Sequence, residues 1–408
     1  MGQRLVGGGD GNHVSMLSEA FPADHREDPR IEDRPVPAFR FRRPRRPSRQ
    51  RTAPQAPTAM SSCPFPGPAI DPDRPDHSAR SDDSTHPLPA DPAERAAVVG
   101  RPSSLPPLLD PDLRMRPLGE PLPPPLRAHG GPLADLFARW LRQRDDAAHA
   151  PEKAALTRAL QALSEDEIRS HARRQAAIAM RGGWSHWSWA VPAATVASLL
   201  GLPMTDLDAQ RRLHGRLRAM AAGLAATADQ AAVKTAGEAA TALLDALDEA
   251  EQRAPDAPLQ WTLLRHAAPS RWSDRATFAA NRLALIWQSH EAGAALLGHA
   301  LLRMRETRRA LARDELLAIA REGGAVRNTR RVDPNGDVVL VPLAGTDHPF
   351  GDGAHRCPGQ GLTLGTLVAA LTWLSEQADL RLPAPGAPLT LANMDIPQFP
   401  DQNQEPSP

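Results

Sequence analysis

The stretch HPFGDGAHRCPGQG (His348–Gly361) holds one of only two cysteines in a chain of 408 residues. Its glycines leave the loop with little side-chain bulk, and glycine tolerates a positive φ or a close approach of the backbone to a flat ligand. Pro358 follows the cysteine, and proline suits the first turn of a helix because it lacks an N–H and has a fixed φ. We therefore expect Cys357 to lie at the N-terminus of a helix.

A thiolate is favoured at such a position. Backbone N–H groups and the positive end of the helix dipole stabilise it, and His355 and Arg356 can add positive charge beside the sulfur. A thiolate in a loop of low bulk suits a metal that accepts one soft ligand. A buried structural cysteine is one alternative. A nucleophilic cysteine is another, but it needs a general base, and the sequence singles none out.

Composition and patterning exclude several classes of protein. Cys63 and Cys357 cannot form a disulfide framework for a chain of this length, so a reducing, cytoplasmic location is expected. The formal net charge is zero, which gives no overall attraction to nucleic acid or to a membrane surface. The longest apolar stretch, Trp189–Pro203, is too short to span a bilayer, and the N-terminus lacks a secretory signal. We expect neither a nucleic-acid partner nor a membrane partner.

Residues 1–90 are predicted to be disordered. They are rich in Pro, Arg, Ser and Asp and have no helical or alternating apolar period, so they cannot bury enough surface to offset the entropy of ordering. Phe39–Arg51 contains seven arginines. This segment is either a tail for an anionic surface or a solvated basic linker, and a start at Met60 would remove it.

Segments with a helical period follow from residue 91 onward. The apolar positions 133, 136, 137, 140 and 141 form one stripe, and Leu364, Leu367, Val368, Leu371 and Leu374 mark a buried helix after Cys357. The best strand signal is Asp337–Leu343. The sequence predicts one mainly α domain with a small β component, with helices over 133–143 and 191–201, within 210–253 and 274–313, and after residue 357.

Five positions of the cysteine loop form the pattern F-x-x-G-x-H-x-C-x-G, which closely resembles the haem-binding loop of the cytochrome P450 family. In that family the cysteine is the proximal thiolate ligand of the haem iron. The resemblance implies haem b (iron protoporphyrin IX) as cofactor and Cys357 as its metal ligand. It implies a propionate contact for His355, packing beside the sulfur for Phe350, and backbone close to the macrocycle at Gly353 and Gly359.

Three further segments fall in the family's order. Asp145–Lys153 resembles the helix start that carries a His-x-x-x-Arg propionate clamp, which maps to His149 and Lys153 with lysine in place of arginine. Residues 194–203, ATVASLLGLP, resemble a helix and turn common in bacterial members. Residues 325–332 resemble the strand whose arginine contacts the second propionate, which maps to Arg331.

The stretch Leu283–Leu302 resembles the long helix over the distal face of the haem. The family pattern there is small-Gly-x-acid-Thr-Thr, and this chain has QSHEAG over residues 288–293. The resemblance implies proton delivery by the acid, Glu291, whose alternative is a solvated helix carboxylate. The threonine position falls on Ala292. A zinc-protease HExxH motif is excluded because residue 294 is alanine.

The sequence also departs from the family. The buried Glu-x-x-Arg pair falls on residues 318–321, where Arg321 is kept and the glutamate is Ala318, so we expect Arg321 to bear a desolvation cost or to find another partner such as Glu315. Only eighteen residues separate Arg331 from Phe350, where the family has several dozen. We expect a truncated cytochrome P450-like fold, with a haem domain over 91–395 and a disordered tail over 396–408.

Two functions follow from the resemblance. The first is a haem-thiolate monooxygenase that inserts one oxygen atom of O₂ into a small apolar organic substrate. Its electrons would come from a ferredoxin and ferredoxin reductase-type donor, and side chains near residues 285–297 would line the pocket. The second is a degenerate member that acts as a haem sensor or uses peroxide, or that binds no haem.

Overall fold

The computed structural model describes residues 106–117, 122–377 and 381–401. The predicted disordered region, with Cys63 and the arginine-rich segment, lies outside these ranges. The helices are α2 (Pro124–His129), α3 (Pro132–Arg139), α4 (His149–Gln161), α5 (Glu165–Met180), α6 (Gly183–Leu199), α7 (Leu207–Leu224), α8 (Gln230–Arg253), α9 (Pro258–His266), α10 (Arg275–Thr307), α11 (Arg313–Arg321) and α12 (Gln360–Ser375). Short 3-10 turns lie at Leu141–Gln143, Pro269–Arg271 and Gly353–His355, and the strands are β1 (Asn328–Val332), β2 (Val338–Pro342), β3 (Leu389–Leu391) and β4 (Met394–Ile396).

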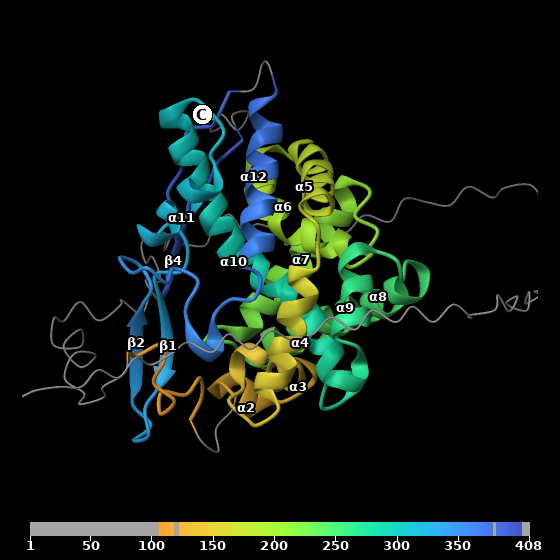
Figure 1. Cartoon of the computed structure of the whole chain (residues 1–408), viewed down its shortest axis with the longest axis vertical. Coiled ribbons are helices and arrows are strands. Elements are labelled where there is room, and N and C mark those ends of the chain that lie inside the picture. Colours follow the sequence, from red (N-terminus) through yellow and green to blue (C-terminus); the bar gives the residue numbers. More distant parts are fainter. Residues whose placement is uncertain (1–105, 118–121, 378–380, 402–408) are drawn as a thin grey trace, which may run out of the picture. The chain divides into compact units, whose positions relative to one another are not determined.

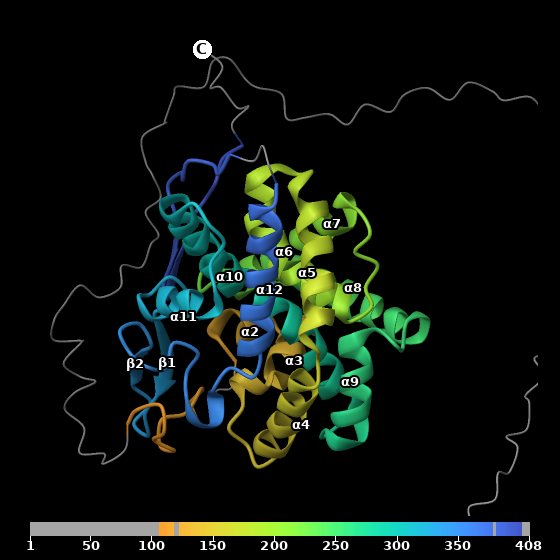
Figure 2. The same ribbon diagram turned by 45° about the horizontal axis from the view of Figure 1, so that its top comes forward.

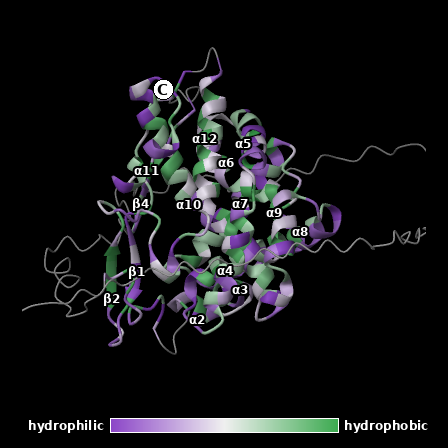
Figure 3. Ribbon diagram, viewed as in Figure 1, coloured by the Kyte–Doolittle hydropathy of each residue, from purple (hydrophilic) through white to green (hydrophobic). Residues whose placement is uncertain are grey.

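The long helix α10 runs through the middle of the domain (Figures 1 and 2). It packs against α3, α6, α8, α11, α12 and β4, while the β1–β2 hairpin lies on the side away from α8 and α9. Figure 3 shows that α6 and α12 are mostly hydrophobic, whereas α5 carries many hydrophilic residues. The predicted mainly helical class is therefore confirmed. Within the described ranges, no helix has the length and apolar character needed to cross a bilayer.

Helix α10 begins and ends for local reasons. The Asp274 carboxylate accepts a hydrogen bond of 2.6 Å from the backbone N–H of Thr277, which satisfies one of the free donors of the first turn. At the other end Arg308 adopts the left-handed conformation (φ 58°), so the chain turns there instead of continuing to residue 313 as predicted. Residues 313–321 form the separate helix α11.

Helix α6 corrects a second boundary. The prediction placed Pro192 in the first turn, but the helix begins at Gly183 and Pro192 lies inside it. The carboxylate of Asp401 accepts hydrogen bonds from the N–H of Trp184 (2.5 Å) and the hydroxyl of Ser185 (2.7 Å), so a distant segment caps this end. Tertiary packing overrides the local signal because every residue of α6 from Ala190 to Ala197 is buried.

The helix expected over 133–143 is interrupted at Trp140. Its backbone is extended (φ −67°, ψ 126°), and its side chain is buried against Trp287 with ring centroids 6.0 Å apart. Asn281 of α10 stabilises the interruption, because its amide oxygen accepts the N–H of Leu141 (2.9 Å) and its nitrogen donates to the carbonyl of Arg139 (2.9 Å). The 3-10 turn Leu141–Gln143 follows.

The predicted tail boundary is also wrong for the described residues 396–401. Ile396 and Phe399 are buried, and Pro397 packs on Gly298 of α10. This segment covers apolar surface of α10 and supplies the cap of α6, so it belongs to the domain.

The expected strand near residue 337 is confirmed as β2, which pairs with β1 in an antiparallel hairpin. Val332 at the end of β1 also forms an isolated bridge with Arg114. Because side chains alternate along a strand, Thr329 and Arg331 share one face, and both line the cavity described below.

A close helix crossing yields the first test. A Cβ added at Gly293 of α10 would lie 2.6 Å from the Cβ of Pro192 on α6. We expect Gly293→Ala to lower the free energy of unfolding by about 1–3 kcal/mol, as overpacking does, measured by urea unfolding.

The matched control is Gly215→Ala in α7, where nothing lies within 4 Å of an added Cβ. It should stabilise by about 0.5–1 kcal/mol, since alanine is the better helix residue. A Gly293→Ala protein as stable as the control would contradict the close crossing.

Candidate functional site: a cationic cavity at Cys357

A cavity with about 1230 Å³ of empty space, partly open to solvent, separates α10 from the cysteine loop. One face of α10 contributes residues at helical spacing, and apolar side chains of other elements form most of the remaining wall. The lining includes Leu141, Leu156, Ala284, Leu285, Gln288, Ser289, Ala292, Gly293, Leu296, Val326, Leu343, Phe350 and Cys357.

The cysteine loop is held by its own backbone. The N–H of Cys357 donates to the carbonyl of Phe350 (2.9 Å), and Gly351, with φ 73°, lines the cavity. Helix α12 begins only at Gln360, so Pro358 precedes the helix, and the N–H of Gly359 hydrogen-bonds the sulfur. Cys357 therefore lies just ahead of the helix and faces the cavity.

The expectation of an easily ionised thiol is wrong for the chain by itself. Burial raises the pKa of Cys357 and outweighs the Gly359 N–H and the charges of Lys153, Arg142 and Arg356, which act in the opposite direction. His355 is not among these charges, because it pairs with Asp145. A coordinated metal ion reverses this balance, since coordination deprotonates a thiol.

The two predicted loop glycines have different surroundings. Gly353 (φ 61°) lies against the backbone of Leu108, where an added Cβ would come within 2.9 Å of the carbonyl oxygen. It therefore packs on the segment around residue 108 and does not line the cavity. An added Cβ at Gly359 would meet only the Cys357 sulfur, at 3.9 Å. Gly351, which the pattern did not single out, is the glycine of the loop that lines the cavity.

Three permanent cations line the cavity. Arg331 is 4% exposed and donates to the hydroxyl of Thr329 (2.8 Å) and a backbone carbonyl, while the Lys153 ammonium donates to the carbonyl of Ala354 (3.1 Å). Arg142, in the turn after Trp140, is the third, and the sequence prediction missed it. Among the described residues no Asp or Glu lines this cavity. Burial lowers the pKa of both Arg331 and Lys153.

The predicted histidines lie together at the edge of the cavity. The rings of His149 and His355 are 4.6 Å apart, and His355 Nε2 lies 2.7 Å from a carboxylate oxygen of Asp145. The Nε2 atom of His149 and the Nδ1 atom of His355 are buried without a hydrogen-bond partner among the described residues. Burial, followed by the nearby positive charges, lowers the pKa of His149 to about 4. His149 is therefore neutral near pH 7 and is not the second cation expected beside Lys153.

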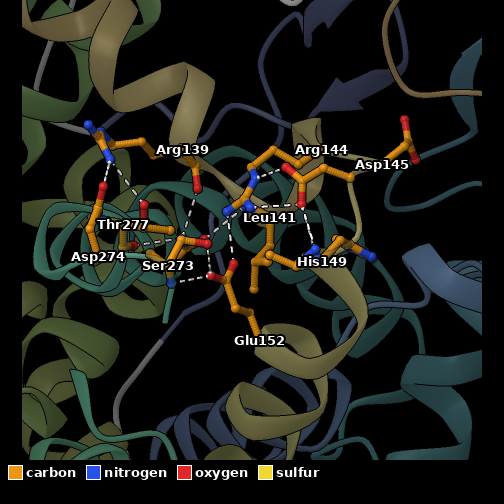
Figure 4. Close-up of polar contacts among 12 residues, drawn as sticks. Arg139, Leu141, Arg144, Asp145, His149, Glu152, Ser273, Asp274 and Thr277 are labelled. Atoms are coloured by element: carbon orange, nitrogen blue, oxygen red, sulfur yellow. Dashed lines mark hydrogen bonds and ion pairs between the residues drawn. The ribbon is translucent and has the colours of Figure 1, made fainter. Parts of the chain in front are cut away.

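A buried acidic residue that the sequence analysis missed ties this edge to α10 (Figure 4). Glu152 of α4 is 1% exposed and accepts hydrogen bonds from the N–H and hydroxyl of Ser273 (both 2.6 Å) and from Arg144 (2.8 Å). Arg144 also binds Asp146. The signal in the sequence was the charged run RQRDD before α4, but it does not single out Glu152, because Ser273 lies 121 positions away from Glu152.

The distal helix separates its two predicted residues. Ala292 lines the cavity, whereas Glu291 lies one residue away around the helix and is not part of the lining. Burial raises the pKa of the Glu291 carboxyl, and the charge of Arg142 partly offsets this shift. Gln288 lies one turn before Ala292 and faces the same cavity.

The predicted cost at Arg321 does not arise, because Arg321 is exposed. Glu315 does not substitute for the missing glutamate either. Its carboxylate pairs with Arg309 (2.7 Å) and accepts the N–H of Ala312 at the start of α11. In this shortened chain α11 is attached by apolar residues such as Leu316 and Ile319.

No family model and no curated protein match the chain at significance. Solved structures do. A bacterial P450, P450BioI, in complex with hexadec-9Z-enoic acid ligated acyl carrier protein, matches with a TM-score of 0.54 at 15% identity over 75% of this chain and 88% of that chain.

Two others are comparable. The cytochrome P450 enzyme CxnD for C–S bond formation in chuangxinmycin biosynthesis has a TM-score of 0.52 at 18% identity, covering 72% of this chain and 83% of its own. A versatile cytochrome P450 enzyme from Bacillus subtilis has a TM-score of 0.51 at 14% identity, covering 68% and 91%. The predicted cytochrome P450-like fold is thereby confirmed.

The buried network around Glu152 gives a second test. Glu152→Ala leaves the N–H and hydroxyl of Ser273 without their acceptor and leaves Arg144 with Asp146 alone, so we expect a loss of about 3 kcal/mol in the free energy of unfolding. Glu165→Ala is the control, because Glu165 is exposed and faces Arg313 at 3.4 Å; its effect should stay within about 0.5 kcal/mol. Equal effects in chemical unfolding would refute the role assigned to Glu152.

Proposed function

We propose that this protein is a haem-thiolate monooxygenase that inserts one oxygen atom of O₂ into a small, largely apolar substrate. One observation carries the proposal: in a fold shared with cytochrome P450s, Cys357 faces an apolar cavity whose charged lining is entirely cationic within the described ranges. An iron porphyrin has a soft-ligand metal, a flat apolar body and two carboxylates, and each part has a counterpart in this lining.

The residues fit the cofactor on independent grounds. Arg331 and Lys153 face the cavity without a carboxylate partner, and the buried His149 Nε2 and His355 Nδ1 atoms lack hydrogen-bond partners in the described structure. Propionates would satisfy such groups. No cluster of three His, Cys, Asp or Glu side chains in the described chain could hold a metal, so a metal here needs most of its ligands from a cofactor. Cys357 would supply the thiolate that binds the iron of the cofactor.

When bound, the haem supplies the oxygen-activating and electron-accepting chemistry. The protein positions the cofactor and the substrate and keeps water away from them. Leu156, Leu285 and Leu296 give the cavity an apolar wall that excludes water and holds a hydrophobic substrate. Glu291, whose pKa burial raises, can hold a proton closer to neutral pH and release it through water.

The opposite side of the cysteine loop suits an electron donor. A second, open depression there is lined by Arg313, Arg356 and Lys153 together with Cys357, and Glu165 is the only acid in its described lining. A basic surface next to the iron ligand favours an acidic partner of the ferredoxin class. This supports the electron route of the monooxygenase.

A second candidate function is a haem sensor or a peroxide-using oxygenase. The observation that favours it is Ala292, which faces the cavity at the position where the family has a hydroxyl. Without that hydroxyl, protons must reach the distal side by another route. A peroxide-using enzyme has less need of such delivery, because peroxide brings its own protons.

The carbon monoxide spectrum tests the first proposal. The reduced protein with carbon monoxide should show the strongly red-shifted Soret band of thiolate ligation. Cys357→Ala should abolish this band, because it removes the ligand, while Cys63→Ala leaves it unchanged. A band typical of histidine ligation, or equal behaviour of the two variants, would exclude Cys357 as the ligand.

Ala292→Thr separates the two candidate functions. A hydroxyl at residue 292 would face the cavity and could orient a water there, so we expect more product per NADPH consumed and less peroxide released. The control is Ala295→Thr, a buried position outside the cavity lining. Unchanged peroxide release in Ala292→Thr would count against a proton-limited monooxygenase.

A further inference from the structure

Arg142 is placed by an interruption of regular structure. Helix α3 ends before Trp140. The amide oxygen of Asn281 accepts a hydrogen bond from the N–H of Leu141, and a 3-10 turn begins at Leu141, at the cavity wall. The side chain of Arg142 lines the cavity together with Leu141. Its position is therefore fixed at the backbone by α10 and not by contacts of its own guanidinium.

The Arg142 guanidinium has no ion pair and no hydrogen bond with any residue in the described part of the chain. Neighbouring arginines have such partners: Arg139 binds Asp274 (2.6 Å), Arg144 binds Glu152 (2.8 Å), and Arg116 binds Gln143 (3.0 Å). The charge of Arg142 acts on both the Cys357 sulfur and the Glu291 carboxyl, so it lies between the cysteine loop and the distal helix. This exposed guanidinium lines the cavity, and no carboxylate of the described chain pairs with it, so it is free to bind an anion that enters the cavity.

The next step rests on the proposed function. Two haem propionates would use two of the three cavity cations. Lys153 and Arg331 suit them, because Lys153 is tied to the cysteine loop at Ala354 and Arg331 is fixed by Thr329. The third cation, Arg142, is then left without a counter-charge.

A second polar group in the same cavity is also unused. Gln288 lies where the family has a small residue, and its amide makes no hydrogen bond within the described ranges. Two hydroxyls of the wall are already engaged, since Ser289 donates to the carbonyl of Ile286 and Thr329 accepts from Arg331. An unpaired guanidinium and an unused amide in one cavity can bind a carboxylate, and the leucines of the same cavity can hold the hydrocarbon body attached to it.

We propose that Arg142, assisted by Gln288, binds the carboxylate of the substrate, whose apolar body lies along the leucines of the cavity. The substrate class is thus an amphipathic carboxylic acid. Arg142 sets specificity by orienting the substrate and takes no part in the bond changes.

The experiment measures binding, not turnover. Decanoate and decan-1-ol are titrated into the haem-loaded protein by calorimetry, and the Soret shift is recorded in parallel. Arg142→Gln should weaken decanoate binding by about 10- to 100-fold, which corresponds to the loss of a charge-assisted hydrogen bond, and should leave decan-1-ol unchanged. The affinity of Arg142→Lys for decanoate should lie between those of the parent and of Arg142→Gln, because lysine keeps the charge but not the bidentate geometry.

The matched control is Arg356→Gln, which removes the same charge from an exposed residue of the opposite depression and should bind decanoate as the parent does. Haem content is measured for every variant. Loss of haem from Arg142→Gln would assign Arg142 to a propionate and overturn the proposal, as would equal weakening of acid and alcohol. A parent protein that takes up no haem would instead refute the proposed function, whereas Arg142-dependent binding of decanoate would still be measurable by calorimetry.

Discussion

The rest of the site depends on positive charge that the fold leaves uncompensated around one cavity. Arg331, Lys153 and Arg142 reach its wall from a strand, a helix and a turn, and no carboxylate of the described chain joins them there. Arg331 is 4% exposed, and its desolvation costs free energy that no ion pair in the described chain recovers. An anionic ligand would recover this free energy on binding, so ligand binding and the stability of the domain are coupled.

The helix α10 connects this cavity to the stability of the domain. Its buried Asn281 interrupts the chain after α3 and so presents Arg142, while Gly293 lets it approach Pro192 of α6. At its start, Ser273 binds Glu152 of α4, the helix that also carries Lys153. Packing and ligand recognition therefore use the same helix, which explains why so many of its residues are buried.

The shortened chain changes how the elements are braced. Arg321 is exposed and Glu315 serves the start of α11, so no buried Glu-x-x-Arg pair supports the proximal side within the described residues. The segment 396–401 contributes instead by burying Phe399 and capping α6 with Asp401. Apolar burial and a cap replace a buried ion pair, which carries a large desolvation penalty.

The sequence by itself determined the mainly helical class, the β2 strand and the placement of Cys357 directly ahead of a buried helix, because apolar periodicity and Gly/Pro signals are local. The resemblance to the cytochrome P450 family also identified Lys153, Arg331 and Ala292 as candidate residues, and all three line the cavity. Tertiary structure alone decided the rest. Arg142 becomes a cavity residue only because Asn281, some 140 positions away, interrupts the helix before it. His149 loses its charge only through burial against His355, and Pro192 stays inside a helix only because its surroundings are packed. Each of these features depends on contacts between segments that are distant in the sequence. The free energy of such contacts cannot be read from a local sequence pattern.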